Sequence, residues 1–317
     1  MSEELLSVNN LKKYFSTGAG TVHAVDDISF SINKKETLGL VGESGCGKST
    51  TGRTVIRLIE PTAGEIIYNN KNIADLNKRE LRQTRREMQI IFQDPYSSLD
   101  PRKSIGDTIG KPLQIHKFGT KKEIEDKVDE LMEKVGLSPD IYNKYPHELD
   151  GGRRQRVGIA RALSLNPNFI VCDEPVSALD VSIQAQILNL LEELQHDMDL
   201  TFLFIAHDLS VIKHISTRIA VMYLGKIVEI APKNALFKNP VHPYTKALLS
   251  AVPIPKLNRR HDRIILEGAV PSPINPPSGC SFHPRCKEMM PICKEIDPAE
   301  TMVGEDHRVN CHLVSEK

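Results

Sequence analysis

The segment at residues 42–50, with the sequence GESGCGKST, constrains the fold of this chain more than any other. It fits the pattern G-x-x-x-x-G-K-[ST] and follows a short apolar run, residues 37–41, that is typical of a strand. After the segment, apolar residues recur at helical spacing, which predicts a helix over residues 51–59. Strand, glycine-rich loop and helix in this order form a phosphate-binding P-loop. We therefore expect the chain to bind a nucleoside triphosphate.

Each residue type in this loop has an expected task. Glycines let the backbone curl so that successive N–H groups face a phosphate, and the following helix adds its positive N-terminal end. We expect Lys48 to reach the β- and γ-phosphates and the Ser49 hydroxyl to hold Mg²⁺. A glycine-rich turn that binds nothing is the alternative, and the complete strand–loop–helix context disfavours it. The residues expected to contact the nucleotide are Gly42, Ser44, Gly45, Cys46, Gly47, Lys48, Ser49 and Thr50.

Composition limits the class of protein. The 317 residues leave room for one domain of ordinary size plus an appendage. Lys+Arg and Asp+Glu are both 41, so no global basic field directs the chain to nucleic acid. The first ten residues carry acids where a secretory signal carries lysines, and no apolar run approaches the length of about 18 residues that a spanning helix needs. We expect a cytosolic chain, or one held to a membrane only by protein partners.

Strand and helix signals alternate along most of the chain. Residues 1–35 predict two strands separated by a polar turn at residues 16–21. Apolar periodicity predicts an amphipathic helix over residues 183–198. The runs that predict buried strands are residues 88–92, 169–172 and 201–206. This alternation predicts an α/β fold with a mostly parallel sheet and helical cover.

Two regions interrupt the alternation. Residues 93–149 contain early prolines and then a charged helix over residues 121–135, which indicates an insertion of different character. After about Ala251 the pattern gives way to prolines. We expect this stretch to be a linker into a small C-terminal module that cannot build a large core of its own.

Polar side chains follow two of the predicted strands. Asp173 and Glu174 come directly after residues 169–172, and His207 follows residues 201–206. Carboxyl ends of parallel strands form the ligand side of an open α/β sheet. Asp173 is thus expected at the Mg²⁺ and Glu174 at an attacking water. The alternatives are a solvated acidic turn and a structural histidine.

The order and spacing of these motifs resemble the nucleotide-binding subunits of ABC transporters over residues 1 to about 250. The matches are residues 42–50 with the Walker A loop, Gln93 with the Q-loop, residues 149–153 with the LSGGQ signature, Asp173 and Glu174 with Walker B and its catalytic glutamate, residues 177–180 with the D-loop, and His207 with the switch histidine. The resemblance implies a P-loop ABC-type ATPase domain at residues 1–250. It also implies a mostly parallel core sheet, an antiparallel N-terminal β subdomain and a helical subdomain inserted at about residues 94–165.

The resemblance implies roles for these residues. The nucleotide would be ATP, with Mg²⁺ held by Ser49, Gln93 and Asp173. Glu174 would polarise the attacking water, and His207 and Gln93 would sense the γ-phosphate. Two such subunits would close head to tail, with each ATP between one Walker A loop and the other subunit's signature, which here is Asp150, Gly151, Gly152 and Arg153.

The adenine contact and the membrane partner are further implications of the resemblance. Phe15 falls where the family places an aromatic residue that stacks on adenine, and Tyr14 is the neighbouring possibility. In the alternative, either ring is a core aromatic at a strand end. The helical subdomain would grip the coupling helix of a membrane subunit, so that hydrolysis does work on another protein.

The signature departs from the family at two positions. Asp150 and Arg153 stand where Ser and Gln are usual. Two like charges about 4 Å apart repel by roughly 4 kcal/mol at an effective dielectric constant near 20, so a carboxylate here opposes the γ-phosphate. Arg153 offsets part of this charge. Alternatively, Asp150 caps a helix that starts near Gly152. In either case, we expect this signature to interact more weakly with the γ-phosphate than the usual signature does. We therefore expect the chain to pair with a second, non-identical ATPase subunit.

Four of the six cysteines lie in the last 38 residues, with spacing C-x5-C-x6-C-x17-C. Clustered thiols in a cytosolic protein favour a metal site over disulfides. Zinc sites usually show tighter Cys pairs, whereas four thiolates suit a [4Fe–4S] cluster. The expected ligands are Cys280, Cys286, Cys293 and Cys311. A zinc site that also uses His283, His307 or His312 is the alternative, and unliganded thiols are a third.

The segments HPYTKALL from residue 242 and PSPINPP from residue 271, with these cysteines, narrow the resemblance. They resemble the C-terminal extension of oligopeptide/dipeptide and nickel importer ATPases, where related cysteines hold an iron–sulfur cluster. Residues 251–317 would be this extension. The resemblance implies a peripheral protein at the cytoplasmic face of the membrane, with two integral membrane permease subunits and, indirectly, an extracellular peptide-binding protein.

Two other classes of protein compete with the importer ATPase. A soluble ABC ATPase of DNA repair or translation with a zinc module would also explain the cysteines. The zero net charge and the importer-type tail argue against it and against a nucleic-acid partner. A GTPase would need an Asn-Lys-x-Asp stretch, which the sequence lacks.

Overall fold

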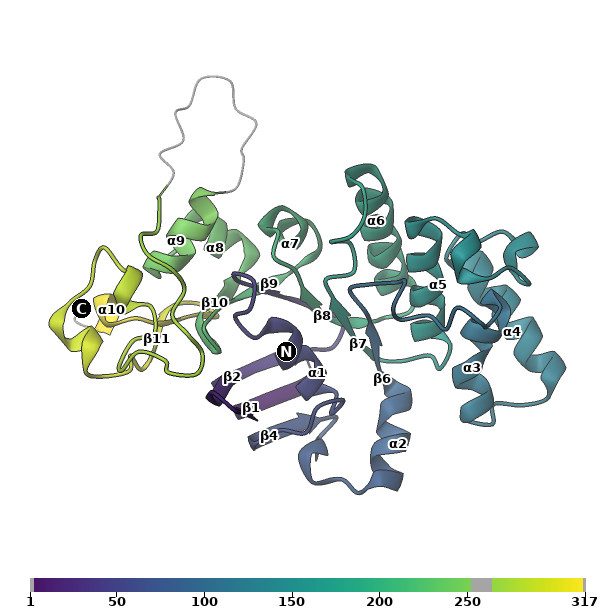
Figure 1. Cartoon of the computed structure of the whole chain (residues 1–317), viewed down its shortest axis with the longest axis horizontal. Helices are drawn as coiled ribbons and strands as arrows, with labels where there is room; N and C mark the ends of the chain where they lie inside the picture. Colours follow the sequence, from purple (N-terminus) through teal and green to yellow (C-terminus); the bar gives the residue numbers. More distant parts are fainter. Residues whose placement is uncertain (1–2, 252–263, 316–317) are drawn as a thin grey trace. The chain divides into compact units, whose positions relative to one another are not determined.

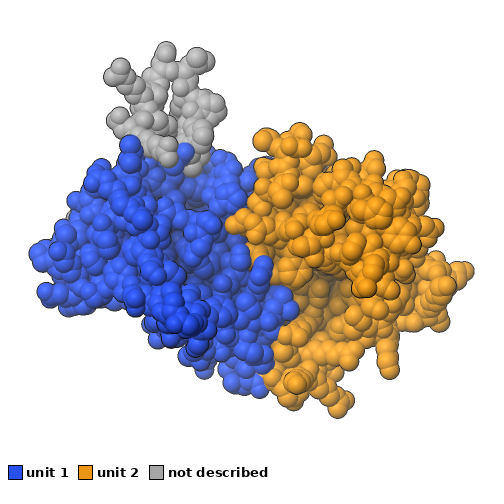
Figure 2. Space-filling view, in the orientation of Figure 1, with its two compact units in different colours: residues 1–75, 204–317 blue, residues 76–203 orange. Residues whose placement is uncertain are grey.

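The computed structural model describes residues 3–251 and 264–315, which divide into two compact units (Figures 1 and 2). Unit 1 comprises residues 1–75 and 204–317, and unit 2 comprises residues 76–203. The boundary falls inside strand β8 (Thr201–Ile205), so this strand has residues in both units.

Unit 1 begins with an antiparallel sheet in the strand order β2-β1-β4-β5. Its strands are β1 (Glu4–Thr17), β2 (Gly20–Asn33), β4 (Ala63–Tyr68) and β5 (Lys71–Asn72). The two strands expected in residues 1–35 are confirmed, with Val8 opposite Phe30 in the ladder. Both of these side chains are buried, because alternate residues of each strand turn toward one face.

The second sheet of unit 1 surrounds the strand that precedes the P-loop. Its order is β11-β12-β10-β9-β3-β8. The strands are β3 (Thr37–Val41), β9 (Arg218–Tyr223), β10 (Lys226–Pro232), β11 (Glu300–Gly304) and β12 (His307–Asn310). β3 and β9 are parallel, whereas β10, β12 and β11 continue the sheet antiparallel. The C-terminal segment thus contributes two strands to this sheet, which its proline content did not predict.

Short helices complete unit 1. They are α1 (Lys48–Val55), α7 (Leu209–Ile215), α8 (Lys233–Lys238), α9 (Pro243–Ser250), α10 (His312–Ser315) and the 3₁₀ turns η1 (Ile73–Asp75), η4 (His283–Arg285) and η5 (Pro291–Lys294). The helix after the P-loop was expected over residues 51–59, but it begins at Lys48 and ends at Val55. Arg57 has a left-handed backbone with φ 51°, which ends the helical path.

Unit 2 contains strands β6 (Met88–Ile91) and β7 (Phe169–Asp173), which are parallel, in the order β8-β7-β6. Its helices are α2 (Lys78–Glu87), α3 (Ile105–Ile115), α4 (Lys121–Lys134), α5 (Gly151–Leu163), α6 (Val181–Asp197) and the 3₁₀ turns η2 (Pro139–Ile141) and η3 (Pro146–Glu148). The predicted buried strands and the two predicted amphipathic helices are confirmed. The start of α4 is set by a capping box of Thr120 and Glu123.

None of the helices within residues 3–251 and 264–315 has the length and apolar character needed to cross a bilayer.

Candidate nucleotide site

The P-loop connects β3 to α1 and folds back around its own lysine. Lys48 is buried, and its Nζ donates hydrogen bonds to the carbonyl oxygens of Gly42 at 2.8 Å and Glu43 at 3.0 Å. Ser44 and Gly45 are exposed at the tip of the loop. Ser49 and Thr50 are half-buried in the first turn of α1, and Cys46 is buried beneath the loop.

Two glycines of the loop lie where a side chain does not fit. Gly47 has φ 106°, and a Cβ atom there would lie 2.0 Å from the Ala24 carbonyl oxygen. A Cβ atom at Gly42 would lie 2.1 Å from the Met222 carbonyl oxygen. The loop backbone therefore rests directly on β2 and β9, and the pattern of glycines follows from this close approach.

The N-terminus of α1 has the character of an anion site. Gly47 is its N-cap, no side chain caps it, and no acidic residue lies in its first turn. The first N–H groups of a helix and its macrodipole both favour a bound anion. Together with the Lys48 ammonium, this helix end can hold the phosphates of a nucleotide.

In unit 2, β7 delivers two carboxylates at its end. Asp173 is fully buried as the last residue of the strand, and Glu174 follows with a left-handed backbone, φ 48°. This conformation is uncommon for a residue with a side chain and turns Glu174 out of the strand direction. Its Oε2 accepts a hydrogen bond from Gln93 Nε2 at 2.9 Å. The structure thus brings together two of the expected catalytic residues, while Ser177 N–H closes the turn on the Glu174 carbonyl oxygen.

His207 lies at the carboxyl end of β8 in unit 1 and is exposed. The preceding residue, Ala206, donates its N–H to the Leu40 carbonyl oxygen of β3 at 3.2 Å. That hydrogen bond places the end of β8 beside the strand that leads into the P-loop. Asp208 then caps α7 by accepting a hydrogen bond from the Ser210 N–H at 2.7 Å.

Asp150 is the N-cap of α5. Its Oδ1 accepts a hydrogen bond from the Arg153 N–H at 2.8 Å, and its Oδ2 lies 3.4 Å from Arg153 Nε. The helix-capping explanation of Asp150 therefore describes the local geometry, and the Arg153 guanidinium lies next to the carboxylate. Gly151 and Gly152 pack closely, because a Cβ atom at Gly152 would lie 2.8 Å from Ile183 Cγ2.

The two candidate adenine-stacking rings have different surroundings. The Tyr14 hydroxyl donates a hydrogen bond to Asp26, and its ring centroid lies 4.3 Å from that of His23. Burial, followed by the Asp26 carboxylate, raises the pKa of Tyr14. Phe15 is half-buried, and Lys13 Nζ lies 4.7 Å from its ring centroid. Because Tyr14 is held by Asp26 and His23, Phe15 stays the stronger candidate.

The four C-terminal cysteines lie in one neighbourhood of unit 1 but do not form a metal centre. The Cys280 N–H donates to the Cys293 carbonyl oxygen at 2.9 Å, and burial, with the other three thiols adding to it, raises the pKa of Cys280 to about 11. Within residues 3–251 and 264–315, no three Cys, His, Asp or Glu side chains are grouped closely enough to hold a metal ion. The expected metal-binding character of the extension is therefore not supported by this geometry, although its donor chemistry suits a metal. The other two cysteines, Cys46 and Cys172, are buried.

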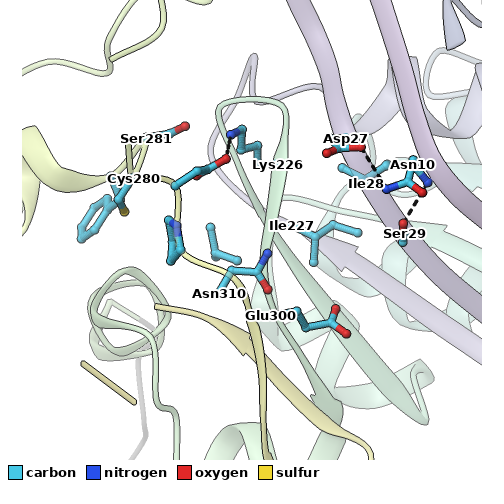
Figure 3. A pocket seen from close by; sticks show the side chains of 14 residues that line it. Asn10, Asp27, Ile28, Ser29, Lys226, Ile227, Cys280, Ser281, Glu300 and Asn310 are labelled. Carbon is cyan, nitrogen blue, oxygen red and sulfur yellow. Dashed lines mark hydrogen bonds and ion pairs between the residues drawn. The ribbon is translucent and has the colours of Figure 1, made fainter. Parts of the chain in front are cut away.

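A separate pocket of about 360 Å³ lies between the first hairpin, β10 and the C-terminal segment (Figure 3). Asn10 Nδ2 donates to Asp27 Oδ1 at 3.1 Å on one wall, and Lys226 forms an ion pair with Asp297 on another. Its lining contains no P-loop residue, so it is distinct from the nucleotide site.

Sequence reasoning missed two residues beside the P-loop. The Tyr244 hydroxyl accepts a hydrogen bond from the Glu43 N–H at 3.0 Å, and Arg285 forms an ion pair with the Glu43 carboxylate at 2.7 Å. No local motif indicates these contacts, because Tyr244 and Arg285 are far from Glu43 in the sequence.

Comparison with known proteins identifies the family. A model described as ABC transporter matches residues 25–177. The oligopeptide transport ATP-binding protein AppF of Bacillus subtilis (strain 168) is 52% identical over 323 residues, which cover 99% of this chain and 98% of AppF. The chain belongs to the ABC transporter family, among its oligopeptide transport ATP-binding proteins. The putative oligopeptide transport ATP-binding protein YkfD of the same organism is 55% identical over 98% of this chain and 95% of YkfD. A second model, the C-terminal region of oligopeptide/dipeptide transporters, matches residues 228–293.

This ABC protein shares its fold with solved ATP-binding cassettes. A dimeric, post-hydrolysis structure of the cassette MJ0796 bound to ADP and Pi has a TM-score of 0.67 and 29% identity, and covers 72% of this chain and 98% of that one. The structure of cbiO1 from Clostridium perfringens, part of the ABC transporter complex cbiONQ, has a TM-score of 0.66 and 26% identity, and covers 75% of this chain and 92% of that one. The expected ABC ATPase fold is confirmed, and the chain is an ABC-type ATPase.

Proposed function

We propose that this ABC ATPase powers the import of di- or oligopeptides, and that ATP drives closure of an ATPase dimer. The supporting observation is the identity of 52% to AppF, because that alignment covers 99% of the chain and includes its C-terminal segment. A soluble ABC ATPase of DNA repair or translation is the alternative. The match of residues 228–293 to the oligopeptide/dipeptide transporter C-terminal region favours the importer.

The importer function defines the partners. The chain acts at the cytoplasmic face of the membrane with two integral permease subunits and a second ATPase subunit. An extracellular peptide-binding protein delivers the substrate to the permeases and acts on this chain only indirectly. Purification of the tagged chain from its native membranes tests this assembly. Co-purification of permease subunits is expected, whereas recovery with ribosomes or DNA instead would favour the soluble alternative.

The site residues have different proposed roles in ATP hydrolysis. Lys48 and the α1 N-terminus bind the phosphates, Phe15 stacks on adenine, and Glu174 orients and polarises the attacking water. The hydrogen bond from Gln93 holds the Glu174 carboxylate in a defined orientation. Mg²⁺, when bound, neutralises charge that develops on the phosphates. Its proposed ligands are Ser49, Gln93 and Asp173, and the oxygen donors of these side chains suit this ion.

The proposed second ATPase subunit is not identical to this chain. Asp150 presents a carboxylate where a signature serine would donate a hydrogen bond to the γ-phosphate. Arg153 offsets this charge only in part, since both side chains are more than half exposed and water screens the pair. A partner with a competent signature would complete the nucleotide site on this chain's own P-loop.

Replacing Asp150 with serine is expected to raise the ATPase rate of the purified chain about fivefold, because it removes a screened like charge opposite the phosphate. Serine is also a good N-cap, so α5 should keep its start. The measurement is steady-state hydrolysis at saturating ATP. Asp140→Ser, which removes an exposed carboxylate paired with Lys144 elsewhere in unit 2, is the matched control. Equal rates for wild type and Asp150→Ser, or brisk cooperative hydrolysis by the wild-type homodimer, would contradict this explanation.

The proposed ligand of the C-terminal cysteines is a [4Fe–4S] cluster, with Zn²⁺ as the alternative. Each histidine that a Cys/His zinc site would use has one ring nitrogen in a hydrogen bond, and His283 Nδ1 lies 3.0 Å from the Cys280 carbonyl oxygen. His307 Nε2 lies 2.7 Å from Glu229 Oε1, and His312 Nε2 lies 2.8 Å from the Ile296 carbonyl oxygen. The four thiols are the donors of the proposed cluster, and cluster assembly would have to draw them together. A structural role for the cluster follows, because none of the proposed catalytic residues lies in this segment.

A further inference from the structure

A bidentate ion pair between Arg285 and Glu43 joins the C-terminal segment to the P-loop. Arg285 Nη1 lies 2.7 Å from Glu43 Oε2, and Arg285 Nη2 lies 3.2 Å from Glu43 Oε1. The Arg285 side chain is only 8% exposed and that of Glu43 is 29% exposed. Bidentate pairs of this kind are stronger and more directional than a single charge contact. Glu43 is the second residue of the P-loop, so the pair acts directly on the phosphate-binding backbone.

Arg285 is held in place by buried aromatic rings. It ends the 3₁₀ turn η4, and its guanidinium carbon lies 5.9 Å from the Tyr223 ring centroid. Phe282, the residue directly before this turn, packs edge-on against Tyr223 with centroids 5.2 Å apart. Tyr223 and Phe282 are both fully buried. The ion pair to Glu43 is the first cause of a raised pKa of Arg285. The guanidinium therefore stays charged and has little rotational freedom.

The backbone of Glu43 is held as firmly as its side chain. Its N–H donates to the Tyr244 hydroxyl at 3.0 Å, and its carbonyl oxygen accepts from Lys48 Nζ at 3.0 Å. Tyr244 is fixed in turn, because His242 Nδ1 accepts the Tyr244 N–H at 3.0 Å as the cap of α9. Burial lowers the pKa of His242, which keeps the ring neutral and able to accept. Each polar group of Glu43 thus has a partner, and one partner is the phosphate-binding lysine.

Arg285 compensates the negative charge that Glu43 places in the phosphate-binding loop. A carboxylate inside a loop that binds a triphosphate repels the incoming phosphates, and such repulsion is strong where water is partly excluded. Arg285 neutralises this carboxylate with a side chain that is nine-tenths buried. It also holds the loop in one conformation before the nucleotide arrives, which lowers the ordering cost of binding.

We propose that Arg285 is a positioning residue of the nucleotide site: it compensates the charge of Glu43 and preorganises the P-loop around Lys48. This inference rests on the proposed function of the loop as the ATP site. It assigns the C-terminal segment a direct part in nucleotide affinity.

The test is a double-mutant cycle in the full-length chain, read out as the Kd of a fluorescent ATP analogue. Arg285→Met should weaken binding about tenfold, because it strips the charge partner from Glu43. Glu43→Gln alone should change the Kd less than about threefold, and Glu43→Gln with Arg285→Met should recover to within about threefold of wild type. The Arg285→Met effect should grow at low ionic strength, where screening is weakest. Lys287→Met, which removes an exposed charge paired with Glu267 in the same segment, is the matched control and should bind as wild type does.

A purely structural role of Arg285 gives a different pattern. The double variant would then bind no better than Arg285→Met, and that result, or an unchanged Kd in Arg285→Met, overturns the inference. If Arg285→Met does not fold by circular dichroism, Arg285→Lys replaces it. Lysine keeps the positive charge but cannot form the bidentate contact of the guanidinium, so it should weaken binding about threefold. A wild-type Kd for Arg285→Lys would overturn the positioning role. The variant Lys48→Ala distinguishes a failure of the positioning role of Arg285 from a failure of the proposed function of the loop as the ATP site. Equal binding by wild type and Lys48→Ala would show that the loop is not the ATP site, which overturns the proposed function and the inference with it.

Discussion

Replacing Glu174 with glutamine is expected to lower the maximal rate of ATP hydrolysis at least about a hundredfold, because loss of a general base typically costs that much. Glutamine has the same shape, so its amide oxygen can keep the hydrogen bond from Gln93. Lys48 and Asp173 are untouched, and ATP affinity should change less than about threefold. The variant should therefore bind ATP, fail to hydrolyse it and remain as a closed dimer. The measurements are the hydrolysis rate in the assembled transporter, the ATP Kd and the dimer fraction by size-exclusion chromatography.

The matched control for this prediction is Glu133→Gln, which makes the same chemical change at an exposed position of α4. It should hydrolyse ATP at the wild-type rate. Near-normal turnover by Glu174→Gln would show that another group activates the water. Loss of ATP binding together with hydrolysis would instead assign Glu174 a role in the structure of the site.

Anaerobically purified protein is expected to contain about four irons per chain, as a [4Fe–4S] cluster on Cys280, Cys286, Cys293 and Cys311 requires. Cys286→Ser should contain less than about one iron, because it removes one of the four thiolates. Its C-terminal segment should also become more sensitive to protease, since metal ligation adds folding free energy in small segments. The measurements are metal analysis, the absorption spectrum and limited proteolysis.

Cys172→Ala is the control for the cluster prediction, since Cys172 is fully buried in β7 and is not one of the proposed ligands. It should keep its full iron content. A content of one zinc and no iron per chain would support the zinc site and contradict the cluster. Neither metal, with all four thiols open to alkylation in the folded protein, would exclude both.

The parts of the fold that the sequence predicts are those set by local chemistry. The P-loop is one contiguous segment. Its glycines and Lys48, together with the apolar runs on either side, are therefore enough to predict the strand, the loop and the helix. The strand at β7 is an unbroken apolar run ending in Asp173, and all of its residues are buried. The cap at Asp150 follows the general preference of helix N-termini for short acceptors.

The parts that the sequence does not predict depend on contacts between distant segments. β11 is mostly exposed and carries no buried-strand pattern, and β12 joins the sheet through pairing of Glu229 with Val309. Its proline-rich surroundings gave no sign of that pairing. The contact of Arg285 with Glu43 likewise depends on how η4 packs against the P-loop. The cysteine spacing shows four donors, but the distances between their sulfur atoms are a tertiary property.

Uptake of labelled peptide by proteoliposomes tests the central claim most directly. The vesicles would contain the permease subunits, this chain and its partner ATPase subunit, with ATP supplied on the side of the ATPase subunits and the peptide-binding protein on the other. We predict that uptake requires ATP, and that vesicles with Glu174→Gln take up less than about a tenth as much peptide as wild type. Peptide and its binding protein should also stimulate hydrolysis. Equal uptake with wild type, with Glu174→Gln and without this chain would contradict the proposed function.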